Sequence, residues 1–357
     1  MSMRRRSFAA ACLAAVVTLA ASIAAQPGRA EPISIQWATV GDAGNAGYVS
    51  GTATYGAVPY VYDIMKYEWT NTQYTSFLNA IDPDGTNPNL VYSGSMGIEA
   101  RGGITNTGTV NGSRYAVKAN MGDKPVNFVS WFNAARVANW LHNGAQDYLS
   151  SDASATAPQN VGAYTLGTGT NGTAPARNPG ALYAIPTENE WVKAAFYKGG
   201  GTNAGYWTYP TQSDTAPTAV TADSTGIGSA GATGNFANFS NTADWNSQNG
   251  NVTTVGTNGG PNAYDLYDMA GNLGEWNDLD GAAGTTRGRR GGNWQNPANV
   301  FTIDGNRNAT TDPAAVQSIN GFRLVAVPEP SQLVFVAGLG AALGAWRLRK
   351  FRRPTAG

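Results

Sequence analysis

The sequence predicts an α+β fold with little regular secondary structure, folded as a single domain over residues 33–326. Helical periodicity is limited to three short stretches, and the candidate strands are few and short. The chain of 357 residues contains 45 glycines and many Thr, Asn and Ala residues, so turns and loops must take up much of it. Its 10 tryptophans and 16 tyrosines supply large, rigid side chains for a core. No second core pattern is visible, which favours one domain.

The charge balance excludes one class of partner. Only 13% of the residues are charged, and Lys and Arg together equal Asp and Glu together at 23 each. A nucleic-acid-binding protein would carry a basic excess or a basic stripe on one face. We therefore expect no nucleic acid among the partners of this protein.

Residues 1–30 have the three-part layout of a secretory signal peptide. Arginines at 4–6 precede an apolar stretch over 8–25, and residues 28–30 (Gly-Arg-Ala) offer a cleavage site. A retained membrane anchor is the alternative. The only cysteine, Cys12, lies inside the apolar stretch. Cleavage would therefore leave a mature protein without disulfides, thiolate metal ligands or a cysteine nucleophile.

The first part of the predicted domain contains two strands and one helix. Alternation of apolar and polar residues predicts strands over 33–37 and 60–67. The helix begins at Thr70 or Asn71, either of which can cap it, and ends at the turn 82–85. Its apolar residues recur at helical spacing on one face: Tyr74, Phe77, Leu78 and Ile81. We expect this face to pack on the core.

Two further helices follow along the chain. Residues 124–129 predict a short strand, after which Ser130 caps a helix that ends near Gly144. The third helix begins with a capping box, in which Thr187 and Glu190 exchange hydrogen bonds. Two segments without periodicity are expected to form long loops with short strands: 145–180 and 199–262.

The C-terminal residues 327–357 have a three-part layout of their own. They open with Val327, Pro328, Glu329 and Pro330. An apolar span over 333–346, about two thirds of the length that crosses a membrane without strain, precedes a basic end over 347–353. This layout resembles the PEP-CTERM sorting signal of Gram-negative bacteria. The resemblance implies an exosortase-type sorting enzyme as a partner, transient passage through the inner membrane, and delivery to the cell surface or the exopolysaccharide matrix. An ordinary C-terminal anchor is the alternative.

Several stretches match a single family in that family's order: 66–74, 125–131, 185–191, 267–276, 290–294 and 321–324. They resemble the formylglycine-generating enzyme, or sulfatase-modifying factor, domain family. The most informative stretch is 267–276, which reads Tyr-Asp-Met-Ala-Gly-Asn-Leu-Gly-Glu-Trp. The resemblance spans about 66–325 and implies a compact, loop-rich α+β fold related to C-type lectins.

Members of this family usually bind calcium, and the resemblance implies a structural calcium site within this stretch. Side-chain oxygens would come from Asp268 and Glu275, and backbone carbonyls from Gly271 and Leu273. Calcium takes six to eight oxygen ligands, which suits a turn that glycine permits. The alternative interpretation is that Asp268 and Glu275 cap a turn and pair with a neighbouring arginine.

The founding activity of the family uses two cysteines that hold copper. Counting from the glycines at 291–292 places their equivalents near Asn296 and Phe301, and neither is a thiol. Because soft thiolates are what select copper, we expect no copper at this position. We assign no catalytic residue and expect formylglycine formation to be lost.

Other chemistries find little support in the sequence. His142 is the only histidine, so a site with several histidine ligands cannot form within one chain, and its place at a helix end suits a capping role. A glycosidase needs two carboxylates at a set separation. No spacing selects such a pair among the candidates: Glu68, Glu99, Glu188, Glu190 and Asp278.

A binding role is better supported, because polar residues gather where the family has its substrate groove. The candidate groove residues are Trp294, Gln295, Asn296, Asn299, Asn306 and Arg307. Aromatic faces with Asn and Arg donors suit sugars or a peptide backbone. The alternative is that Trp294 belongs to the core and that Arg323 forms an internal ion pair.

Two functions stay open on the sequence alone. We favour an exported, calcium-stabilised, non-catalytic protein that binds an exopolysaccharide or a surface protein, or serves a structural role. The alternative is an extracellular enzyme that modifies a peptide or a glycan by cysteine-independent chemistry. Whether the protein is an enzyme is thus undecided, with formylglycine-generating activity disfavoured because the cysteine pair is missing.

Overall fold

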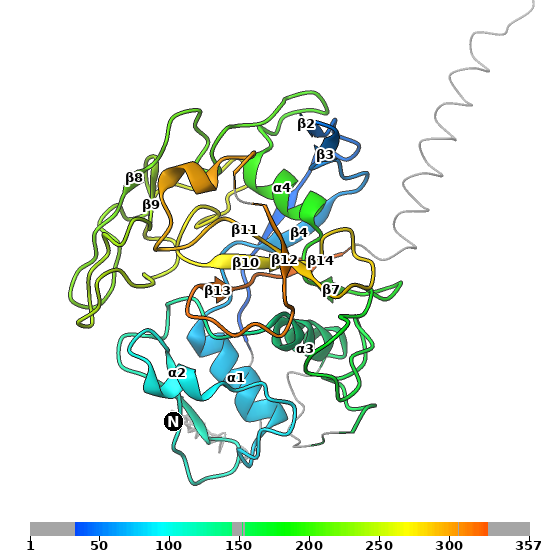
Figure 1. Cartoon of the computed structure of the whole chain (residues 1–357), viewed down its shortest axis with the longest axis vertical. Coiled ribbons are helices and arrows are strands. Elements are labelled where there is room, and N and C mark those ends of the chain that lie inside the picture. Colours follow the sequence, from blue (N-terminus) through cyan, green and yellow to red (C-terminus); the bar gives the residue numbers. More distant parts are fainter. Residues whose placement is uncertain (1–32, 145–151, 153, 306, 328–357) are drawn as a thin grey trace, which may run out of the picture.

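The structure, a computed structural model, describes residues 33–144, 152, 154–305 and 307–327 (Figure 1). The predicted signal peptide and, apart from Val327, the predicted sorting tail lie outside these residues. Within the described ranges, no helix is both long enough and apolar enough to span a membrane.

Two four-stranded sheets occupy the centre of the described fold (Figure 1). All pairs of the first sheet are antiparallel, in the order β1 (Trp37–Val40), β4 (Tyr62–Met65), β14 (Val325–Ala326) and β7 (Tyr183–Ala184). The second sheet has the order β12 (Asn308–Thr311), β11 (Arg287–Arg290), β10 (Gly274–Asn277) and β13 (Asn320–Gly321). Strand β13 runs parallel to β10. Three strand pairs lie outside these sheets: β2 (Tyr48–Ser50) with β3 (Ala53–Tyr55), β5 (Ile104–Asn106) with β6 (Tyr115–Val117), and β8 (Thr218–Ala219) with β9 (Phe236–Ala237).

The three predicted helices are confirmed, together with their caps. The helical elements of the described chain are α1 (Asn71–Ile81), α2 (Gly94–Ile98), α3 (Trp131–His142), α4 (Glu188–Phe196) and the 3-10 helix η2 (Ala298–Phe301). Thr70 caps α1, Ser130 caps α3, and Thr187 forms the predicted capping box with Glu190 at the start of α4. Figure 1 shows α1 and α3 on one side of the sheets and α4 on the other.

The strand predictions are less accurate than the helix predictions. Strand β4 falls inside the predicted 60–67, but β1 begins at Trp37, where the predicted 33–37 ends. The strand predicted over 124–129 is wrong. Its backbone donors go to separate partners, because Val126 donates to the Trp69 carbonyl and Phe128, at a φ of 56°, donates to that of Gln317. An extended segment that bonds to a different element at each position forms no ladder.

Large aromatic side chains fill the core between the sheets and helices, as the composition suggested. Five tryptophans are almost fully buried: Trp69, Trp131, Trp140, Trp191 and Trp276. Phe77 of α1 meets Trp140 of α3 with their ring centroids 5.5 Å apart, which joins the two helices. Trp69 stacks on Phe322 at 5.7 Å, so the C-terminal part of the domain packs directly against the start of α1. These contacts between rigid aromatic rings hold the helices and sheets in place relative to one another, and the loops connect them.

Candidate functional site

A buried ion pair joins Glu275 of strand β10 to Arg323. The Glu275 carboxylate receives the guanidinium of Arg323 at 2.6 and 2.7 Å, and the indole N–H of Trp191 donates to it at 2.8 Å. Arg323 also donates to the carbonyls of Met65 at 3.1 Å and Tyr267 at 3.0 Å. Both charged side chains are buried. This pair therefore connects β10 to β4, to α4 and to the loop that precedes β10. Both carboxylate oxygens of Glu275 accept hydrogen bonds from protein donors.

Asp268 sits in the tight loop that leads into β10, at a φ of 57°. Its two oxygens accept hydrogen bonds from the Gly256 amide at 2.6 Å and the Asn258 side-chain amide at 2.8 Å. Burial raises the pKa of Asp268, although these donors oppose the shift. Asp268 also lines a small cavity of about 10 Å³ beside Gly259 and Gly260, which is the space of about one water molecule.

A third carboxylate, Glu68, completes the buried charge cluster. It accepts hydrogen bonds from the Leu273 amide at 3.0 Å and the Asn272 side chain at 2.8 Å. Burial, followed by the charges of Asp268 and Glu275, raises the pKa of Glu68 well above its ordinary value. The sequence stretch that identified the fold is therefore held in place by a carboxylate from the residues just before α1.

The four residues predicted to bind calcium differ in what they could offer a cation. Glu275 pairs with Arg323, as the alternative interpretation expected, and presents no free oxygen. Gly271 lies so close to its neighbours that a Cβ would stand 2.1 Å from the Asn238 carbonyl oxygen, so only glycine fits. Asp268 alone faces a small space of suitable size. Among the described residues, no group of three or more His, Cys, Asp or Glu side chains is arranged to hold a metal ion.

The predicted ligand groove is partly open and partly closed. Three of its residues are exposed: Gln295, Asn299 and Arg307. The guanidinium of Arg307 forms a salt bridge with Glu188 at 2.6 Å, and Glu188 forms a second salt bridge with Arg290 at 2.8 Å. Trp294 is only 4% exposed, and the guanidinium of Arg101 covers its ring at 4.3 Å from the centroid. The prediction of a groove is therefore wrong for Trp294, which belongs to the core, while Asn306 lies outside the described residues.

The positions counted as equivalents of the two cysteines have structural roles. Phe301 ends the 3-10 helix η2, is 1% exposed, and packs edge-on against Phe239 at a centroid distance of 5.3 Å. Asn296 closes a turn by accepting the Asn293 amide at 2.9 Å. Its own carbonyl accepts the Ser240 amide at 3.0 Å. A buried aromatic ring and a turn-forming amide thus stand where the resemblance would place reactive thiols.

Comparison with protein families confirms the resemblance. The profile described as "Sulfatase-modifying factor enzyme 1-like domain" matches residues 51–327. The chain belongs to this family. The match covers most of the chain and includes both central sheets apart from strand β1. The sulfatase-modifying-factor fold is accordingly the architecture described above, with short helices and sheets joined by long loops.

Solved structures that are similar to this sulfatase-modifying-factor-like domain are distant in sequence. Treponema denticola variable protein 1 is 22% identical, with a TM-score of 0.42 over 84% of this chain and 97% of that chain. CarF is 20% identical, with a TM-score of 0.48 over 83% and 99%. PvdO from Pseudomonas aeruginosa is 17% identical, with a TM-score of 0.42 over 82% and 91%. The search of curated proteins finds no match.

The C-terminal comparison gives the cellular destination. A PEP-CTERM protein-sorting motif matches residues 326–350. This motif indicates export through the membrane to the cell surface of a Gram-negative bacterium, and it implies recognition by an exosortase-type sorting enzyme. Of the predicted signal residues, Val327 is described and its amide donates to the Leu182 carbonyl at 2.9 Å. Pro328, Glu329 and Pro330 lie outside the described residues, and the signal peptide over 1–30 stays a prediction.

The other catalytic candidates of the sulfatase-modifying-factor-like domain are held in structural networks. His142 ends α3 and accepts the Leu182 amide on Nδ1 at 3.0 Å, while burial lowers its pKa. Asp278 accepts the Trp131 indole N–H at 2.8 Å and the Tyr164 hydroxyl at 2.5 Å. Glu190 binds Arg177 at 2.8 Å besides closing its capping box. Asp278 and Glu190 are thus buried and bonded to protein donors, and His142 uses Nδ1 in a structural hydrogen bond.

One cavity was missed from the sequence. It has a volume of about 580 Å³ and lies between the residues leading into β1, the start of α1 and the loop around Val255. Its lining residues include Gln36, Tyr67, Thr72 and Asp123. The sequence contained one signal for it, a run of small polar residues on the side of α1 opposite its apolar face. That signal is weak, because any solvated helix face carries such residues.

Proposed function

We propose that the protein is an exported, surface-sorted and non-catalytic domain with a binding or structural role outside the cell. The observation that carries the proposal is the filling of the thiol positions. Phe301 is 1% exposed and packs on Phe239, so its place belongs to the core rather than to a reaction site. A buried ring cannot be exchanged for a metal-binding thiolate without leaving a cavity behind.

The second function, an extracellular enzyme with cysteine-independent chemistry, has less support. Such an enzyme needs an acid, a base or a nucleophile within reach of its substrate. The carboxylates Glu68, Glu190 and Asp278 are buried and bonded to protein donors, and His142 accepts a backbone amide. These contacts favour stability over proton transfer.

The proposal includes calcium as a structural ion, but with fewer protein ligands than the resemblance implied. Asp268 is the side chain that would hold it, beside the backbone of Gly259 and Gly260 in the small cavity. Such a site would stiffen the loop that leads into β10. Glu275 would contribute only by giving up Arg323, which is a costly exchange for a buried charge pair.

For ligand contact we propose the exposed part of the 294–307 stretch. Gln295, Asn299 and Arg307 lie on the surface, and their amide and guanidinium groups can donate to sugar hydroxyls or peptide carbonyls. The partner would be a matrix polysaccharide or a neighbouring surface protein. Because Glu188 already binds Arg307, the guanidinium is held in a fixed direction.

The test is to expose the full-length protein to copper and to a cysteine-containing peptide, with mass spectrometry of the peptide afterwards. We expect the peptide to be recovered unchanged and copper to bind no more tightly than to the Asn296→Ala variant. A peptide aldehyde, or copper affinity that the variant loses, would overturn the non-catalytic assignment. Turnover of an extracellular glycan or peptide without copper would instead establish the second function.

The calcium part is tested separately by thermal unfolding with calcium and with chelator. We expect calcium to raise the melting temperature of the protein and to lose this effect in Asp268→Asn. Glu275→Gln is the matched comparison, because it alters a carboxylate that Arg323 occupies. No calcium effect in the unaltered protein would remove calcium from the proposal.

A further inference from the structure

We propose that the cavity beside α1 binds a segment of a neutral glycan chain. This site goes beyond the surface proposed above, because it is formed by other elements: the residues entering β1, the first turns of α1, and the loops around Asp123 and Val255. Its volume of about 580 Å³ lies within the range of about 300–1,000 Å³ that is usual for small-molecule sites.

Polar side chains in the cavity wall have hydrogen-bonding capacity that the protein does not use. Within the described residues, no hydrogen bond is made by the side chains of Ser34, Gln36, Tyr67, Thr72 and Asp123. Together they present hydroxyls, an amide and a carboxylate, which both donate and accept. Such a mixture matches a ligand whose groups also do both, as sugar hydroxyls do.

The charge of the cavity selects a neutral ligand. Asp123 is the only exposed charged side chain in its wall, since Glu68 is buried with both oxygens bonded. Lys124, in the wall of the adjoining cavity, is buried and donates to the Thr225 carbonyl at 2.7 Å and the Thr254 hydroxyl at 2.8 Å, and Lys66, beside Tyr67, is paired with Asp265 at 2.6 Å. Because the described residues that line this cavity include no cation, an anionic polysaccharide would be repelled by Asp123.

Two side chains of the cavity wall, Tyr67 and Gln73, are held in place by contacts behind it. Tyr67 stacks on Tyr267 at 5.3 Å, and it fits so closely against Gly256 that a Cβ there would stand 2.6 Å from the ring. Gln73 closes the capping box of α1 and also donates to the Ser34 carbonyl at 2.8 Å. Tyr67 and Gln73 are therefore held in place before a ligand arrives, which lowers the entropy that these two side chains lose on binding.

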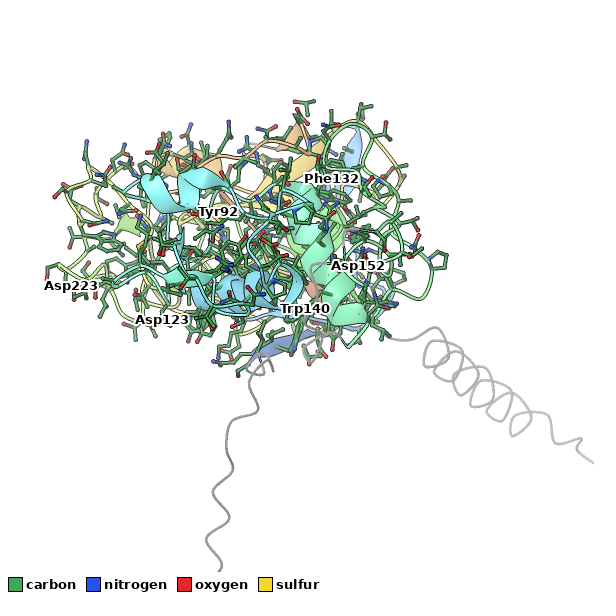
Figure 2. The ribbon with its side chains drawn as sticks, turned by 90° about the horizontal axis from the view of Figure 1, so that it is seen from below. Tyr92, Asp123, Phe132, Trp140, Asp152 and Asp223 are labelled. Atoms are coloured by element: carbon green, nitrogen blue, oxygen red, sulfur yellow. The ribbon has the colours of Figure 1, made fainter. Side chains whose placement is uncertain are left out.

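The shape of the surface favours a chain over a single sugar. A second cavity of about 260 Å³ continues from the first and shares Asp123 and Thr254 with it. Asn120 adds a further side-chain amide along this second cavity, whereas the hydroxyls of Thr225 and Thr257 are already bonded to Asp223 and to the Thr254 carbonyl. Figure 2 shows Asp123 near the edge of the molecule in that view. The two cavities thus adjoin at Asp123 and Thr254, so a ligand longer than one sugar can contact both.

The experiment measures binding of the full-length protein to maltohexaose, cellohexaose and chitohexaose by calorimetry, with alginate and a Gly-Ser peptide as the acidic and peptide probes. We expect at least one neutral glycan to bind. Thr72→Tyr fills the cavity from an exposed helix position and should weaken that binding at least about tenfold, the loss of about one good hydrogen bond or more. Asp123→Ala should weaken it about threefold to tenfold.

Matched controls separate the site from general damage. Thr218→Tyr and Asp280→Ala alter an exposed threonine and an exposed aspartate outside the cavity and should leave binding unchanged. A double variant of Gln295 and Asn299 to alanine tests the surface of the proposed function, and it should leave binding at this cavity unchanged as well. Failure of all three neutral glycans to bind, binding of alginate or peptide in their place, or unaltered affinity in Thr72→Tyr would overturn the proposal.

Discussion

Polar side chains in two regions of this domain differ in both burial and hydrogen bonding. Beneath β10, Glu275 and Arg323 are buried, and each is bonded to several protein partners. Beside α1, Thr72 and Asp123 are exposed, and their side chains bond to no described residue. The residues that reveal the family lie in the first region, and the unused hydrogen-bonding capacity lies in the second. Family resemblance therefore locates what holds the fold together, whereas free polar groups locate where a ligand can bind.

The largest effect should come from breaking the buried pair. Arg323→Ala leaves Glu275 charged, buried and held only by Trp191, so we expect the free energy of unfolding to fall by about 4 kcal/mol. Denaturant unfolding measures it. Arg307→Ala is the matched control, because Arg307 is 42% exposed and Glu188 keeps Arg290, so its cost should stay within about 1 kcal/mol. Equal costs would show that the two regions do not differ as argued.

A somewhat smaller loss of stability should follow from removing the side chain of Phe301, at a position where the resemblance would place a thiol. Phe301→Ala removes a buried ring that packs on Phe239 and should cost about 3 kcal/mol. Asn296→Ala removes the acceptor of one turn hydrogen bond and should cost about 1 kcal/mol. Unfolding curves of both variants decide the matter. A cost for Phe301→Ala near zero would mean that this position is not core and would reopen it as part of a reaction site.

A modest effect is expected where the two regions meet, at the cap of α1. Thr70 accepts the Gln73 amide at 3.3 Å and also lines the cavity. Thr70→Ala should lower the free energy of unfolding by about 1 kcal/mol, the usual cost of a lost N-cap. Thr72→Ala, two residues further along the same helix, should change it by less than about 0.5 kcal/mol. If Thr72→Ala proved the costlier change, its hydroxyl would have a structural role rather than a free one.

The smallest effect on stability should come from the open cavity itself. Asp123→Ala should change the free energy of unfolding by less than about 0.5 kcal/mol, because the carboxylate is exposed and forms no hydrogen bond or ion pair with a described residue. Asp82→Ala is the contrasting variant. Asp82 is 1% exposed and accepts the Asn87 amide and the Tyr115 hydroxyl, so its loss should cost about 2 kcal/mol or more.

The sequence foretold the helices better than the strands for a physical reason. Caps such as Thr70 and Thr187 act within four residues, so their signal is local and both were confirmed. Strands such as β13 and β14 have only two residues, and their pairing depends on segments far away in the chain. Residues 124–129 alternate like a strand but bond to separate partners, which no local pattern reveals.

The candidate site shows the same division. The pairing of Arg323 and the burial of Trp294 were open alternatives in the sequence, and the structure decides both in favour of the core. The cavity could not be foreseen, because Gln36, Thr72 and Asp123 come from separate segments and look like ordinary surface residues. Only the fold brings them to one wall.

Strand β14 connects the folded domain to the sorting motif. It lies between β4 and β7, and its second residue, Ala326, is the first residue matched by the sorting motif. Without Val325 and Ala326, the first sheet lacks the strand that joins β4 to β7. A chain cut short before Val325 would therefore lack both the strand that completes this sheet and the motif that directs sorting.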